Sequence, residues 1–199
     1  MITESDMESF AIKFPDSIKM TDDEFYEFCQ ENEHVRMEKN SKGEIIIMAP
    51  TGGNTGRSNS KIVAKLDLWN EQTQLGVVFD SSTGFALANG ATRSPDDSWI
   101  SRGRWEALTE DEKKKFPPLC PDFVVELMSE SDNLSAAQQK MEEWMDNGCR
   151  LAWLFQPSEE KVFIYTPGQA VKEVESYQQR ISGDTVLPGF TFDLGWIQK

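Results

Sequence analysis

The sequence predicts an α/β fold: a mixed β-sheet flanked by helices, preceded by an N-terminal helix and a β-hairpin. Residues 122–127 (Asp-Phe-Val-Val-Glu-Leu) and 151–156 (Leu-Ala-Trp-Leu-Phe-Gln) are apolar on both alternating faces, apart from their few polar positions. This pattern is typical of strands that are covered on both sides. Helical spacing over 133–147 joins them into a strand-helix-strand crossover, which favours a parallel pair with a right-handed connection.

The N-terminal elements follow from capping and turn chemistry. Thr21-Asp-Asp-Glu24 is a capping box that should start a short amphipathic helix. Strands are expected at about 34–39 and 44–49, joined by a hairpin at Asn40–Gly43. A glycine-rich loop, 51–56, should lead into a long helix over about 55–75.

The rest of the chain alternates short strands with turns and helices. A polar segment, 102–120, should hold one or two short helices that end at Pro117-Pro118. Further strands are expected near 76–80, 84–88, 97–101, 161–165 and 171–175. With 199 residues and 38% hydrophobic content, the chain fits a single domain spanning 1–199, with 1–20 as an N-terminal extension.

Composition narrows the function. The net charge of −14 argues against broad electrostatic attraction to DNA, so any nucleic-acid surface must be a local basic strip. Three widely spaced cysteines indicate reduced thiols, and the acidic N-terminus lacks the pattern of a signal peptide. With no apolar stretch of roughly 20 residues, we expect a cytoplasmic protein with no membrane partner. The lone histidine, His34, makes zinc clusters and a Ser-His-Asp triad poor candidates.

Glu126 is the most informative residue, because it lies within an apolar strand. An ionised carboxylate buried there needs a cation, a proton or a network. Asp122 lies about 13 Å away along the strand and is better read as a strand-end acid. Asp96, which starts the strand near 97–101, can meet Glu126 if the two strands are neighbours, although it could simply begin a turn. Asp97 is a competitor on the opposite face.

Lys140 and Glu38 complete the candidate set. Lys140 borders the apolar stripe of helix 133–147, whose inner face should return over Glu126. Its ammonium could neutralise the acid and stabilise a transition-state phosphate, or it could simply extend into water. Glu38, on the first hairpin, could add a carboxylate or be a solvated strand acid.

A local basic strip is a candidate phosphate site. Arg57, Lys61 and Lys65 are spaced by four and should share one helix face, with the glycine-rich loop at the helix N-terminus. A solvated helix face is the alternative. Three arginines, Arg93, Arg102 and Arg104, form a second possible basic cluster.

An ordered series of motifs resembles the Uma-two family of bacterial restriction endonucleases, within the PD-(D/E)xK nuclease superfamily. The likeness covers about 20–195. Its pieces are Thr21-Asp-Asp-Glu-Phe25, Arg36-Met-Glu38, Ser94-Pro-Asp96, Pro121-Asp-Phe-Val-Val-Glu-Leu127, Gln139-Lys140-Met-Glu-Glu-Trp144, Cys149-Arg-Leu-Ala-Trp-Leu154 and Leu187-Pro-Gly-Phe190.

The resemblance implies a restriction-endonuclease-like core and assigns roles within it. It implies metal ligation by Asp96 and Glu126, an active-site acid role for Glu38 and the catalytic lysine role for Lys140. In the wider superfamily the lysine lies two residues after the acid, where this chain has Met128. A histidine often found before the long helix is replaced here by Gly56-Arg57.

Three functions are compatible with these residues. The first is a Mg²⁺- or Mn²⁺-dependent endonuclease acting on DNA, with the ion held by Asp96, Glu126 and the carbonyl of Leu127, and the attacking water assisted by Lys140. The second is a non-catalytic nuclease-fold module that binds protein or nucleic acid, which the charge of −14 favours. The third is a metal-dependent hydrolase of a small substrate. By analogy with the superfamily, we expect a homodimer.

Overall fold

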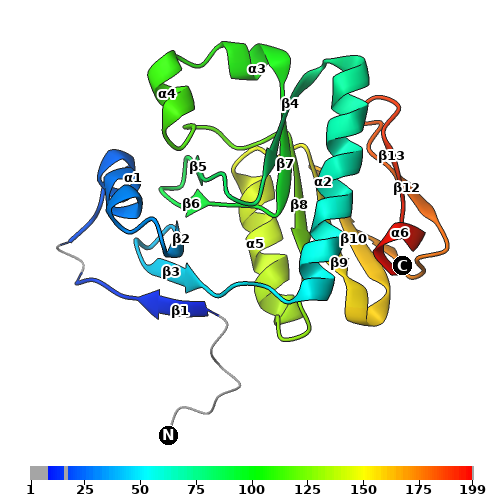
Figure 1. The fold of residues 1–199 in the computed structure, drawn as a ribbon, viewed down its shortest axis with the longest axis horizontal. Helices are drawn as coiled ribbons and strands as arrows, with labels where there is room; N and C mark the ends of the chain where they lie inside the picture. Colours follow the sequence, from blue (N-terminus) through cyan, green and yellow to red (C-terminus); the bar gives the residue numbers. More distant parts are fainter. Residues whose placement is uncertain (1–8, 16–17, 199) are drawn as a thin grey trace, which may run out of the picture. The chain divides into compact units, whose positions relative to one another are not determined.

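The computed structural model describes residues 9–15 and 18–198, and its contacts divide into two compact units. Figure 1 shows the elements of both units. The first unit comprises Met1–Pro50, Thr83–Ser94 and Leu108–Cys120, and the second comprises Thr51–Ser82, Pro95–Ala107 and Pro121–Lys199. The single-domain organisation expected from the sequence stays a prediction.

The second unit is built on a six-stranded sheet with the order β11-β10-β9-β8-β7-β4. Strands β8 and β9 are parallel, whereas the other neighbours are antiparallel, so the predicted mixed sheet is confirmed. The strands are β4 (Gly76–Asp80), β7 (Asp97–Ser101), β8 (Phe123–Leu127), β9 (Leu151–Gln156), β10 (Lys161–Tyr165) and β11 (Lys172–Val174).

Helices α2 (Gly53–Thr73) and α5 (Leu134–Asp146) cover opposite faces of this sheet (Figure 1). Val125 belongs to the same buried cluster as Ile62 and Leu66 of α2. The next residue, Glu126, contacts α5 instead. Adjacent residues of a strand point to opposite faces, so each helix packs on its own side.

The C-terminal segment of the second unit extends the core on the α2 side. It forms a hairpin of β12 (Arg180–Ser182) and β13 (Thr191–Asp193), followed by helix α6 (Gly195–Gln198). Phe190 and Phe192 join the buried cluster, and Phe190 stacks on Trp153 of β9 with ring centroids 5.9 Å apart. Two short helices, α3 (Arg102–Glu106) and the 3-10 helix Pro157–Glu159, complete the unit.

The first unit holds a five-stranded sheet with the order β1-β3-β2-β6-β5. Its strands are β1 (Ser9–Ile12), β2 (Arg36–Lys39), β3 (Ile45–Met48), β5 (Phe85–Ala86) and β6 (Thr92–Arg93). Helix α1 (Asp22–Glu31) begins with the predicted capping box, and α4 (Glu110–Lys114) begins with a second one at Thr109. Gly43 closes the β2–β3 hairpin at φ 82°, a conformation that favours glycine.

The structure differs from the expectations in two places. The segment 51–56 is largely helix rather than loop, because α2 begins at Gly53 with Gly52 as an N-cap that offers no side chain. Helical order therefore overrides the glycine content once Ile62 and Leu66 are buried against the sheet. The short strands β1, β6, β12 and β13 are additions to the predicted set; at two to four residues they are too short to show a period.

Candidate active site

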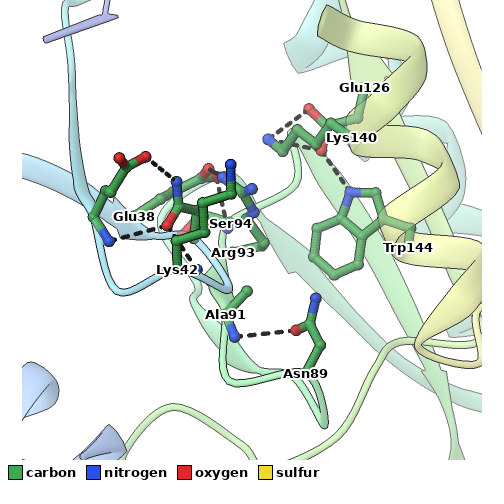
Figure 2. Close-up of polar contacts among 11 residues, drawn as sticks. Glu38, Lys42, Asn89, Ala91, Arg93, Ser94, Glu126, Lys140 and Trp144 are labelled. Carbon is green, nitrogen blue, oxygen red and sulfur yellow. Dashed lines mark hydrogen bonds and ion pairs between the residues drawn. The ribbon is translucent and has the colours of Figure 1, made fainter. Parts of the chain in front are cut away.

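Asp96, Glu126 and Lys140 lie together at one end of β8. Lys140 Nζ lies 2.9 Å from Glu126 Oε1. Asp96 Oδ2 accepts a hydrogen bond of 2.7 Å from the backbone N–H of Leu127, the residue after Glu126. Figure 2 shows the Glu126–Lys140 pair beside Trp144. The structure thus brings together the three side chains on which the sequence argument depends.

The strand register explains this meeting. Strand β7 pairs with β8 so that Asp97 lies opposite Val125. One step further along this antiparallel ladder, the sequence sets Asp96 against Glu126. Asp96 precedes the strand, and its side chain bonds the Leu127 amide where the ladder of backbone pairs has ended.

Helix α5 supplies the groups above Glu126. Asn133 caps it by accepting a hydrogen bond from the amide of Ala136. Lys140 and Trp144 are four residues apart, so they lie one above the other on the same helix face. Both reach back to the strand that precedes their helix, as the crossover predicts.

Trp144 is a site residue for which the sequence predicts only a place in helix 133–147. Its side chain is fully buried, and its indole Nε1–H donates to Glu126 Oε1 at 2.9 Å. Trp and Lys are common on amphipathic helices, and a spacing of four does not reveal that both donate to one carboxylate. The signal that could have pointed to Trp144 is Glu126 itself, because an acid within a buried strand needs hydrogen-bond donors and a buried indole N–H needs an acceptor.

The pair remains partly open to solvent. The side chains of Glu126 and Lys140 are 12% and 21% exposed. The Glu126 carboxylate is thus mostly covered and is held by one ammonium and one indole, but it is not sealed off. A small ion or a phosphate group can therefore approach it.

Asp97 lies next to Asp96 in a different environment. It is 0% exposed, and within the described residues neither carboxyl oxygen has a hydrogen-bond partner. Burial, followed by the charges of Asp96, Asp80 and Glu126, raises the pKa of Asp97 well above its ordinary value. The acids at this end of the sheet are thus close enough to influence one another.

The opposite end of β8 carries a balanced cluster. Asp122 is buried, and its Oδ1 lies 3.0 Å from Arg104 Nη1 and 3.5 Å from Arg150 Nη1. Its Oδ2 accepts from the amide of Ser101 at 2.8 Å. Asp122 is therefore the strand-end acid that the sequence predicts, and its partners identify it as a structural residue.

Glu38 belongs to the first unit and is not a solvated strand acid. It is 3% exposed, and its Oε2 pairs with Arg93 Nη1 at 3.0 Å while Oε1 accepts from the amide of Ser94 at 2.9 Å (Figure 2). The open alternative of a solvated side chain is wrong, because a guanidinium and a backbone donor compensate its burial. An active-site role for Glu38 stays a prediction.

The basic residues of α2 share one face, as expected, but two of them have intramolecular partners. Lys61 donates to the carbonyl of Trp196 in α6, and Lys65 Nζ lies 4.3 Å from the ring centroid of Trp196. Arg57, in the first turns of the helix, is exposed. Arg102 pairs with Glu106 and donates to the carbonyl of Gln74. Arg93 and Arg104 pair with Glu38 and Asp122, so each arginine of the second basic cluster has an acidic partner in the chain.

Asp96 and Glu126 are the groups that could hold a metal ion at this site. Among residues 9–15 and 18–198, no set of three or more His, Cys, Asp or Glu side chains is arranged as a ligand cluster. Mg²⁺, however, is commonly bound by one or two carboxylates and keeps several waters. Two adjoining acids with further negative charge around them fit that ion. Ligation by the Leu127 carbonyl stays a prediction.

His34, the lone histidine, is a surface residue whose side chain is 90% exposed. The three cysteines are free thiols. Across the part of the chain that the structure describes, none of the helices combines the length and the apolar character needed to cross a bilayer.

Comparison with known proteins points to a nuclease family. The chain resembles a crystal structure described as a nuclease "belonging to DUF820" from Anabaena variabilis ATCC 29413, qualified there as putative. The TM-score is 0.73 at 17% identity, with 89% of this chain and 99% of that chain covered, which establishes a common fold. No curated protein matches the chain. The family model Uma2, described as "Putative restriction endonuclease", matches residues 22–195, and the chain therefore belongs to the Uma2 family, the Uma-two family that its motifs resemble.

Proposed function

We propose that the protein is a Mg²⁺- or Mn²⁺-dependent endonuclease that hydrolyses phosphodiester bonds in DNA. The observation that carries the proposal is the convergence of Asp96, Glu126 and Lys140 at one end of β8. Membership of a family described as restriction endonucleases supports the reaction class.

In this proposal Asp96, Glu126 and the carbonyl of Leu127 hold the ion. A bound divalent cation would polarise the scissile phosphate and lower the pKa of a water molecule. The excess of carboxyl groups around Glu126 makes a doubly charged cation electrostatically favourable there.

Lys140 acts on charge at the phosphate. Its ammonium is paired with the Glu126 carboxylate and therefore lies beside the proposed ion. From there it can orient an attacking water or stabilise the negative charge that develops on the phosphoryl oxygens. Trp144 holds the Glu126 carboxylate in place through its N–H, so that the acid presents a fixed geometry.

DNA binding must be local in a chain with a net charge of −14. Arg57 is the exposed member of the basic α2 face, whereas Lys61 and Lys65 also contact Trp196. We retain Arg57, Lys61 and Lys65 as the proposed phosphate contacts, with Arg57 contributing most. A homodimer in the cytoplasm, with a DNA site completed by two copies, is part of the same proposal.

A plasmid-nicking assay in Mg²⁺ or Mn²⁺ tests this function. We expect nicking that requires the metal and is lost in Glu126→Ala. Glu142→Ala, an exposed acid of the same helix, is the matched control and should cleave like the wild type. Cleavage that persists unchanged in Glu126→Ala would identify a contaminating nuclease and remove the proposal.

The charge of −14 favours one alternative, a non-catalytic module that binds protein or nucleic acid. It predicts neither metal affinity in calorimetry nor cleavage of any nucleic acid. A hydrolase of small substrates would instead bind metal and cleave a simple phosphodiester without affinity for DNA. The same protein preparation separates all three outcomes.

A further inference from the structure

Strands β4 and β7 place two carboxyl groups directly opposite each other. Asp80 pairs with Asp97 in the antiparallel register. Opposed residues of such a pair point to the same face, with Cβ atoms about 5 Å apart. Oxygens at the ends of two such side chains can both reach one small cation.

This pair lies on the other side of the sheet from Glu126 and Lys140. Asp97 also lies opposite Val125, so it shares the face that Val125 presents to the α2 core. Glu126, one residue further, points to the α5 face. The Asp80–Asp97 pair is therefore separate from the site proposed above.

Asp97 is the feature that points to a ligand. Its side chain is fully buried, and its two oxygens lack hydrogen-bond partners within the described residues. Burying a carboxyl without hydrogen-bond partners is unfavourable even when the group is neutral, because its bonds to water are lost, and it is more unfavourable when the group is ionised. The lysine of this region is already paired with Glu126.

Asp80 provides the exposed half of the pair. It ends β4, where its Oδ1 accepts from the amide and the hydroxyl of Ser82. These bonds orient the carboxylate through Oδ1, and among the described residues Oδ2 has no hydrogen bond that would compete with a ligand. An ion could thus be held between a rigid rim carboxylate and a buried one, with water completing its shell.

We propose that Asp80 and Asp97 form a second site for a hard divalent cation, Mg²⁺ or Mn²⁺, on the α2 face of the sheet. The cation supplies the positive charge that Asp97 lacks and links the ends of β4 and β7. The role is binding and local stabilisation, independent of whether the protein cleaves DNA.

Mn²⁺ binding followed by the EPR signal of the free ion tests the proposal. We expect two equivalents for the wild type, one for Glu126→Gln, one for Asp97→Asn and none for the double variant. Asp80→Asn, a change at an exposed position, should weaken the second equivalent at least about 10-fold. Asp67→Asn, an exposed acid of α2, is the matched control and should bind two.

The outcomes separate this site from the nuclease site. Retention of one equivalent in Glu126→Gln, and its loss on adding Asp97→Asn, supports the second site even if no cleavage is ever observed. Thermal unfolding adds a second readout, because Mn²⁺ should raise the melting temperature of Glu126→Gln but not that of the double variant. An unchanged stoichiometry in Asp97→Asn, or complete loss of binding in Glu126→Gln, would overturn the proposal.

Discussion

The two ends of strand β8 both carry a buried or half-buried acid, but they differ in charge balance. At the first end, Asp122 is shared by two guanidinium groups and a backbone amide. At the other, Glu126 is paired with Lys140, and its charge, together with those of Asp96 and Asp80, raises the pKa of the buried Asp97. The first end is neutralised by the protein itself, whereas the second retains negative charge that a cation can offset.

Charge balance, rather than burial, separates structural from functional acids in this strand. Burial alone does not distinguish them, because Asp122 is more buried than Glu126. The distinction lies in whether the chain supplies enough positive charge and enough donors. Asp122 has both, so its loss should affect folding, while loss of Glu126 should affect chemistry.

The largest expected effect is on catalysis at Glu126. Glu126→Gln keeps the shape of the side chain but removes its charge, so we expect DNA cleavage to fall by at least about 100-fold. The melting temperature should change little, because Trp144 and Lys140 can still donate to the amide oxygen. Initial nicking rates in Mn²⁺, together with thermal unfolding of the same samples, check this. A large loss of stability with cleavage retained would show that Glu126 is a structural residue.

Asp122→Asn should show the opposite pattern. The amide can still accept from Ser101, but the two arginines lose their anion, which should cost about 1–2 kcal/mol because both guanidiniums are half exposed. Urea unfolding measures the loss, and cleavage per folded molecule should stay at the wild-type level. Glu159→Gln, at an exposed position, is the control with no expected effect.

Trp144→Phe sharpens the description of the Glu126 end. Phenylalanine keeps an aromatic ring but is smaller than the indole and lacks its N–H, so Glu126 loses this donor and we expect Mn²⁺ affinity to fall about 10-fold. Titration with Mn²⁺, followed by the EPR signal of the free ion, measures the affinity. Trp105→Phe, a change away from Glu126 and Lys140, is the control. If affinity is unchanged while the melting temperature falls, Trp144 only packs against the strand.

Asp97→Asn has the smallest expected effect, a pH-dependent change in the free energy of unfolding. In the folded protein the pKa of Asp97 is raised, whereas in the unfolded chain the carboxyl ionises near its ordinary value of 3.8. As pH rises above that value, the unfolded state alone loses the proton, so wild-type stability falls until the folded pKa is passed.

Asparagine cannot ionise, so the variant lacks this decline. In metal-free buffer we expect Asp97→Asn to be more stable than the wild type by about 1 kcal/mol or more at pH 7, with a smaller difference near pH 4. Urea unfolding with a chelator at both pH values measures it. A variant that is less stable than the wild type at pH 7 would mean that Asp97 has a favourable partner in the native state.

Much of the fold could be predicted because strong local patterns agree with tertiary packing. The apolar runs of β8 and β9 and the helix between them fixed the parallel pair, and the capping box fixed the start of α1. The separation of the five-stranded sheet from the six-stranded sheet could not be predicted, because strand pairing between distant segments leaves no periodic trace. The β2–β3 hairpin pairs with β1 and β6 instead of joining the sheet of β8.

The site was likewise predictable only where a local sequence pattern marks it. Glu126 stands out in sequence as an acid in an apolar strand, and the crossover places Lys140 above it. The sequence could not predict that the Asp97 oxygens lack hydrogen-bond partners among the described residues, because this depends on which donors the fold places nearby. Likewise, no local pattern tells that Arg93 neutralises Glu38 or that Trp196 takes up Lys61 and Lys65.

Anomalous diffraction from Mn²⁺-soaked crystals locates the ion without relying on activity. We expect a peak in contact with the carboxylates of both Asp96 and Glu126, absent from crystals of Glu126→Gln. Crystals that bind Mn²⁺ elsewhere, with no peak between these two acids, would contradict it.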